Sequence, residues 1–144
     1  MQISSRFTIA IHILTCVEVF GEEYKITSDF LASSIRVNPV IIRKILSQLR
    51  NAGLIEVARG TGGTKITRPA GEITLYDVYE AVDLLEEGTL FHFHENPNPV
   101  CPVGRNIHKA LDEKLECIQT AMEDEMRRFT IADVVDQIRQ CGDV

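Results

Sequence analysis

Apolar residues recur at intervals of three and four over most of the chain, which is the spacing of one face of a helix. Together with residues that begin and end helices, this pattern predicts helices at about 5–19, 28–34, 39–52, 75–85, 103–128 and 131–140. Short segments at 54–59 and 64–68 flank a glycine-rich tip at 60–63, and they predict a β-hairpin. The expected fold class is therefore mainly α with a small β-hairpin.

The second and third predicted helices and the hairpin together form the pattern of a winged helix-turn-helix. A tight turn at 36–38 separates the two helices, and the later helix has an apolar inner side and a basic outer side. Such a helix fits the major groove of DNA, where residues near its N-terminal end reach base edges. We expect a winged helix-turn-helix DNA-binding region over 1–72, a connecting helix and effector loop over 73–103, and a long dimerisation helix with a C-terminal helix over 104–144.

The distribution of charge supports this division, although the whole chain carries a net charge of −6. Residues 35–70 contain seven basic side chains and one acidic side chain, a net charge of +6. Residues 71–126 contain 13 acidic and three basic side chains, a net charge of −10. So sharp a difference predicts a basic surface that faces phosphate and an acidic body that does not.

Four local strings have the order and spacing of a known family. They are SSRF at 4–7, LSQLRNAGLI at 46–55, RGTGG at 59–63 and ITLYDVYEAV at 73–82. In these strings the chain resembles the Rrf-two family of bacterial repressors over nearly its whole length. That family includes the iron–sulfur cluster regulator, nitric-oxide-sensing repressors and the cysteine-metabolism repressor. The resemblance implies a sequence-specific transcription regulator, by the family's habit a repressor, that binds a palindromic operator in double-stranded DNA as a homodimer.

The resemblance also implies roles for particular residues. Val40, Arg43 and Lys44 match base-reading positions, Arg59, Thr61 and Lys65 match a wing in the minor groove, and Ser4 and Arg6 match phosphate contacts. Asn38 and Ser47, at the start and on the outer side of the same helix, complete the expected DNA-binding set. The chemistry agrees, because an arginine such as Arg43 can contact guanine with two hydrogen bonds and Arg59 suits a narrow minor groove. The alternatives are an ordinary solvated helix face at Arg43 and Lys44, and a plain hairpin turn at the glycines.

The long predicted helix carries an apolar seam whose steps of four, four, three and four are close to a heptad pattern. The seam consists of Ile107, Leu111, Leu115, Ile118 and Met122. It could be covered within one chain or by a second copy. We expect a dimer interface, because a small helical head cannot cover so long a seam and a dimer suits an operator with two half-sites.

The four cysteines are scattered and have no C-x-x-C spacing, so we expect thiols rather than disulfides. Cys16 and Cys117 lie among apolar helix residues and are expected in the core, whereas Cys141 lies near the chain end. Cluster-binding relatives carry three close cysteines before the long helix, and this chain has only Cys101 there. We therefore expect no iron–sulfur cluster and no other metal. Cys101 is either a redox or electrophile sensor, favoured as thiolate by a helix N-terminus, or a small buried residue of the loop. The loop around it is the expected point of response to redox or to a small effector.

Other classes of protein fit the sequence less well. It contains no Ser-His-Asp set, no glycine-rich phosphate loop and no HExxH motif, so we expect no enzyme. The alternative function is a winged-helix protein-interaction module that does not bind DNA. No apolar stretch approaches the ~20 residues that span a bilayer, and we expect no signal peptide because the first residues lack a basic flank leading into an apolar run. We expect a cytoplasmic protein with no membrane contact.

Overall fold

The computed structural model describes residues 3–58, 63–82 and 90–142. In chain order the elements are α1 (Ser5–Phe20), α2 (Ser28–Ile35), α3 (Pro39–Asn51), β1 (Ile55–Ala58), β2 (Gly63–Ile66), the short 3-10 helix η1 (Ala70–Glu72), α4 (Leu75–Val82), α5 (Pro102–Arg128) and α6 (Ile131–Gln140). The strands form one antiparallel hairpin in which Ile55 lies opposite Ile66. The prediction of a mainly α fold with a small β-hairpin is confirmed.

Side chains that the sequence marks as helix caps make the expected hydrogen bonds. The Asn38 side chain accepts a hydrogen bond from the Val40 amide at 2.8 Å, and Pro39 follows at the first helical position. The Thr27 hydroxyl accepts one from the Phe30 amide at 3.1 Å. Gly53 has a φ of +77°, the left-handed conformation in which glycine commonly follows the last turn of a helix. Local sequence therefore decides where α2 and α3 begin and where α3 ends.

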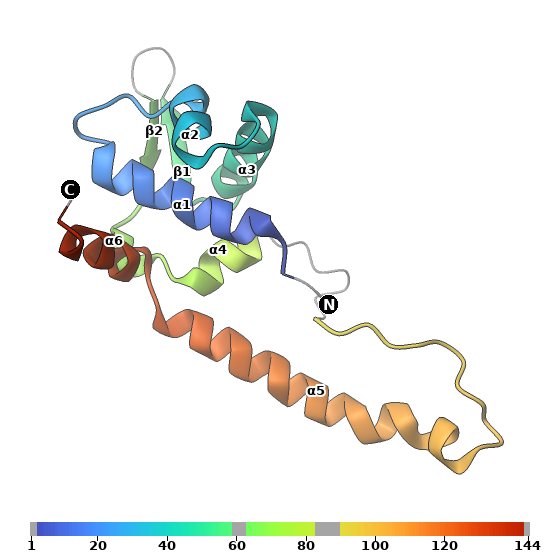
Figure 1. Ribbon diagram of the computed structural model, residues 1–144. Helices are drawn as coiled ribbons and strands as arrows, with labels where there is room; N and C mark the ends of the chain where they lie inside the picture. Colours follow the sequence, from blue (N-terminus) through green and yellow to red (C-terminus); the bar gives the residue numbers. More distant parts are fainter. Residues whose placement is uncertain (1–2, 59–62, 83–89, 143–144) are drawn as a thin grey trace.

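Helix α1 lies at the centre of the core and contacts α2, α3, α4, α6 and β2 (Figure 1). Its buried residues include Ile13 and Leu14. Helix α6 joins the same core, because its residues Ile131 and Val135 are buried among the residues of the N-terminal region. Helix α6 thus packs against α1 in one core, while the three-region division of the sequence remains a prediction.

Helix α5 stands away from this core. It has 27 residues, and none of those residues is buried. Figure 1 shows it extending from α4 and α6, with the segment before it running to its far end. Its C-terminal end is fixed to the core because the Leu75 amide donates to the Phe129 carbonyl at 2.9 Å and the Ile131 amide donates to the Ile73 carbonyl at 2.9 Å. No helix in the described ranges has the length and apolar character needed to cross a membrane.

Candidate nucleic-acid interface

The outer face of α3 collects most of the residues predicted to read DNA. Its inner face is anchored by Ile42, Ile45 and Leu49, which are fully buried. Because a helix turns about 100° per residue, this burial turns Val40, Arg43, Lys44 and Ser47 to the opposite side. Val40 is 63% exposed, Arg43 and Lys44 are also exposed, and Ser47 is half-buried. The structure therefore brings these four predicted residues onto one face.

A groove runs from this face to the hairpin, and we call it the basic groove. Its volume is about 370 Å³. Helix α3 contributes Arg43, Ser47 and Arg50, the connection between α1 and α2 contributes Lys25, and the hairpin contributes Gly63 and Thr64. Three of the lining residues are basic and, among the described residues that line it, none is acidic. Such a groove suits a phosphate chain.

Two of these basic residues, Arg50 and Lys25, were not predicted from the sequence to belong to the site. Arg50 lies seven residues after Arg43, two helical turns along the same side, so its spacing could have placed it in the site. Lys25 carried no such signal, because it lies in the connection between α1 and α2 and reaches the groove only through the fold.

The predicted wing residues are placed differently. Lys65 is exposed on β2, opposite Glu56 of β1. It lines a second hollow with Glu18 and Glu22 of the α1 side, and it does not line the basic groove. Thr64, the preceding residue of β2, lines both hollows, whereas Lys65 lines only the second. Arg59 and Thr61 lie outside the described residues.

The N-terminal pair predicted to contact phosphate lies at the start of α1. The Ser4 hydroxyl accepts a hydrogen bond from the Arg6 amide at 3.1 Å, so it caps the helix. Both side chains are half-buried. Capping of α1 gives Ser4 a structural role whether or not it also contacts DNA.

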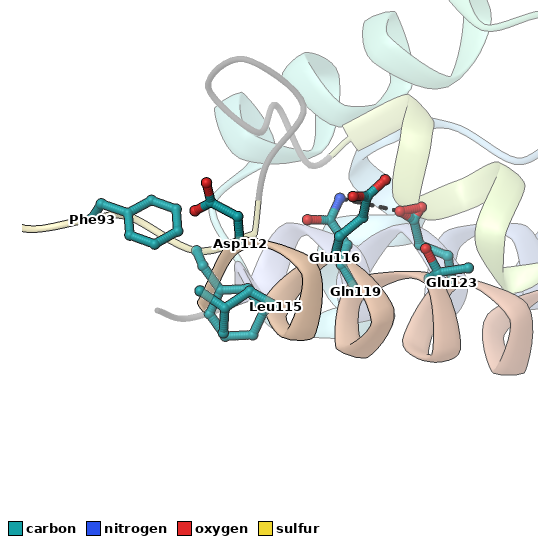
Figure 2. Close-up of a pocket in the computed structure, with 8 residues that line it drawn as sticks. Phe93, Asp112, Leu115, Glu116, Gln119 and Glu123 are labelled. Atoms are coloured by element: carbon teal, nitrogen blue, oxygen red, sulfur yellow. Dashed lines mark hydrogen bonds between the residues drawn. The ribbon is translucent and has the colours of Figure 1, made fainter. Parts of the chain in front are cut away.

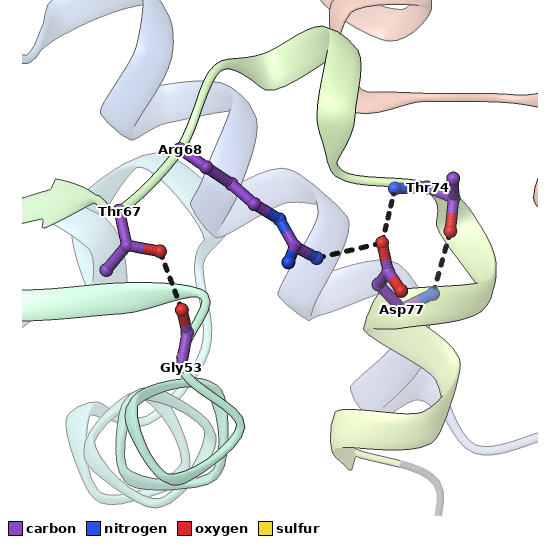
Figure 3. A network of polar contacts seen from close by, with 5 residues as sticks. All are labelled: Gly53, Thr67, Arg68, Thr74 and Asp77. Atoms are coloured by element: carbon purple, nitrogen blue, oxygen red, sulfur yellow. Dashed lines mark hydrogen bonds and ion pairs between the residues drawn. The ribbon is translucent and has the colours of Figure 1, made fainter.

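The base of the hairpin is fixed by the polar contacts in Figure 3. The Arg68 guanidinium lies 3.0 Å from an oxygen of Asp77, and the same oxygen accepts a hydrogen bond from the Thr74 amide at 2.9 Å. The Asp77 amide in turn donates to the Thr74 hydroxyl at 3.0 Å, so the two residues cap α4 reciprocally. On the other side, the Thr67 hydroxyl donates to the Gly53 carbonyl at 2.6 Å. The hairpin is thereby tied to the end of α3 and to the start of α4.

The cysteines divide into one buried and three exposed thiols. Cys16 is buried, its sulfur lies 3.5 Å from the Ser34 hydroxyl, and burial raises the pKa of the Cys16 thiol more than this hydrogen bond lowers it. Cys101 is exposed at the residue that precedes α5, so of the two alternatives for this residue the small buried one is wrong. The expectation that Cys117 belongs to the core is also wrong, because α5 stands apart from the core and leaves Cys117 exposed.

The donor set around Cys101 does not fit an iron–sulfur cluster. A cluster needs about four donors, mostly thiolates. The other three cysteines belong to α1, the middle of α5 and the residue after α6. Within residues 3–58, 63–82 and 90–142, no three histidine, cysteine or acidic side chains are grouped so as to hold a metal ion.

The predicted seam of α5 is open in the single chain. Ile107, Leu111, Leu115 and Met122 are only half-buried, and Ile118 is 53% exposed. Their spacing places them on one side of the helix. An apolar side of this length, only partly covered within one chain, is typical of an interface between subunits.

Comparison with known proteins gives concordant matches. The model of the Rrf2 (Rrf-two) family, described as "Iron-dependent Transcriptional regulator", matches residues 3–137. The chain is 40% identical over 137 residues to YwnA of Bacillus subtilis (strain 168), named as an HTH-type transcriptional regulator, covering 95% of this chain and 99% of YwnA. A crystal structure described as that of a DNA-binding protein is 35% identical, with a TM-score of 0.72 over 90% of this chain and 98% of the other. CymR, the global cysteine regulator of B. subtilis, shares the fold at 18% identity, with a TM-score of 0.71 over 95% of this chain and 98% of CymR.

Proposed function

Because this chain belongs to the Rrf2 family of transcriptional regulators, we propose that it binds DNA sequence-specifically as a homodimer and regulates transcription, most simply as a repressor. The observation that carries the proposal is the outer face of α3, where Val40, Arg43 and Lys44 are exposed next to the basic groove. This face can enter a major groove without moving any buried side chain.

Each basic residue has a separate role in the proposal. Arg43 reads a base, because its guanidinium can donate two hydrogen bonds to guanine. Arg50 and Lys25, farther along the basic groove, attract and position the phosphate chain without reading sequence. The hairpin is proposed to lie beside the DNA backbone as a wing. Its residues Arg59 and Thr61 are proposed to reach the minor groove.

The dimer is proposed to form through the seam of α5. Two copies with their seams together would bury the apolar side that one chain leaves open. Two-fold symmetry would then set two α3 helices against two half-sites about 34–36 Å apart, one turn of the double helix. A palindromic operator follows from this symmetry, and a cytoplasmic location follows from the DNA target.

The regulatory input is proposed to act at the segment before α5, without an iron–sulfur cluster or other metal. Exposure of Cys101 supports a reaction of its thiol with an oxidant or electrophile. The segment 90–93 lines a hollow against α5, which supports binding of a small effector. Anaerobic purification with an absorption spectrum and metal analysis tests the metal-free part of the proposal. A coloured protein with stoichiometric iron and sulfide would refute that part.

Selection of bound sequences from a pool of random duplex DNA tests the main proposal. We expect enrichment of an inverted repeat whose half-site centres are about 10 base pairs apart. The selected duplex then serves as the probe for Arg43→Ala, with Lys109→Ala on α5 as a control that removes an exposed basic residue elsewhere. Arg43→Ala should weaken binding by about 10- to 100-fold and relax one base position, which corresponds to ~1–3 kcal/mol.

Two results would contradict the proposal. If no duplex is enriched, a protein-interaction module on the same fold becomes the better explanation. If Arg43→Ala, the parent and the control Lys109→Ala all bind the selected duplex with equal affinity, α3 does not read DNA. Binding should also fall steeply as salt rises, because contacts with phosphate release counterions.

A further inference from the structure

A third hollow lies far from α3, between α5 and the segment that precedes it. We call it the acidic cavity. Its volume is about 420 Å³, within the range of small-molecule sites. The Leu90 amide donates a hydrogen bond to the Gln119 side chain at 2.9 Å, which holds the start of this segment against α5. Figure 2 shows Phe93 beside Asp112 at one end and Gln119 with Glu123 at the other.

The lining of the acidic cavity combines aromatic rings with carboxylates. Phe91 and Phe93 come from the segment, and Asp112, Glu116 and Glu123 come from α5. None of the described residues that line the cavity is basic. In the described part of the chain, the carboxylates of Asp112 and Glu116 have no hydrogen bond or ion pair, whereas Glu123 accepts one hydrogen bond from Gln119 at 3.1 Å.

This combination selects a particular class of ligand. Carboxylates without partners favour a positive charge, and the faces of phenylalanine rings attract the same charge. An apolar body would lie against the rings and Leu115. A metal ion does not fit, because the described acidic residues are not grouped in the way that ion ligation requires. Among the described residues that line the cavity, an anion would meet negative charge and no positive charge.

The acidic cavity and the proposed dimer seam occupy different sides of α5. At about 100° per residue, the carboxylates lie roughly 120° around the helix from the centre of the seam. Of the five seam residues only Leu115 also lines the cavity. A second copy on the seam therefore leaves the carboxylates open to solvent and to a ligand.

We propose that the acidic cavity binds an organic cation with an apolar body, and that such a cation is the effector class of this regulator. The regulatory role of the cation rests on the proposed function. Binding of the cation does not, because it requires no DNA. A route to the hairpin exists at the other end of α5. The Arg127 guanidinium lies 3.9 Å from the centre of the Tyr76 ring of α4, and Asp77, the next residue, holds Arg68 at the hairpin base.

Calorimetric titration of the full chain with tetraphenylphosphonium tests the inference. Tetraphenylborate is a matched control, since it has the same four phenyl rings and the opposite charge. We expect the cation to bind and the anion not to bind. The double variant Asp112→Asn and Glu116→Gln should weaken the cation about tenfold, because each part-exposed ion pair contributes up to about fivefold. Glu113→Gln, an exposed charge on α5 that does not line the cavity, should bind as the parent does.

Several results would overturn the inference, and they are separable from failure of the proposed function. The inference fails if the parent does not bind the cation or if it binds the anion as tightly as the cation. It also fails if the double variant binds the cation as tightly as the parent does. The same preparations are titrated with the selected DNA duplex. If DNA binding is intact and cation binding is absent, only the acidic cavity is refuted. If cation binding is intact and DNA binding is absent, only the proposed function is refuted.

Discussion

Replacement of Asp77 by alanine should loosen the hairpin base and the start of α4 together. One carboxylate oxygen of Asp77 accepts from the Thr74 amide at 2.9 Å and lies 3.0 Å from the Arg68 guanidinium. Loss of the reciprocal cap costs about 1 kcal/mol. The side chains of the ion pair are 41% and 31% exposed, so solvent screening reduces its contribution to about 0.5 kcal/mol.

The expected loss of unfolding free energy in Asp77→Ala is therefore about 1.5 kcal/mol. Arg68→Ala removes only the ion pair and should lose about 0.5 kcal/mol. For a chain of 144 residues these values correspond to melting temperatures lowered by about 3–6 °C and about 1–2 °C. Urea unfolding measures the loss of unfolding free energy in each variant. The protein concentration is kept fixed, because a dimer's stability depends on concentration. If the two variants are equally destabilised, Asp77 does not act as a helix cap and the reasoning fails.

Two further predictions concern α5 and Cys16. Ile118→Asp places a charge in the open seam, and light scattering should then give a particle of half the parent's mass. Lys109→Gln makes the same change of charge on the opposite side of α5 and should leave the mass unchanged. A monomeric parent would contradict this prediction. Burial raises the pKa of the folded Cys16 thiol above its ordinary value of 9.0, so the folded chain holds this proton while the unfolded chain releases it, and stability should fall as the pH rises above 9.0. Cys16→Ala should lessen this alkaline fall in urea titrations, and an unchanged slope would show that the Cys16 thiol does not cause it.

The sequence alone determined the elements and the face of α3 that carries charge. Caps such as Asn38, and the left-handed residue at Gly53, act through hydrogen bonds and torsions that span only a few residues. The period of α3 turns Arg43 outward once Ile42 and Ile45 are buried, whatever covers them. These features needed no knowledge of the tertiary structure, because they arise within one helical turn or along one helix.

Only the tertiary structure decided which distant residues share a surface. Lys25 joins Arg50 in the basic groove because the α1–α2 connection passes the hairpin, and Lys65 lines the second hollow with Glu18 because β2 pairs in one register. The acidic cavity unites Phe93 with residues of α5 because α5 folds back along the segment that precedes it. Hydrophobic periodicity fixes which side of an element is inward, but the direction in which the chain leaves that element is set by packing across the whole fold.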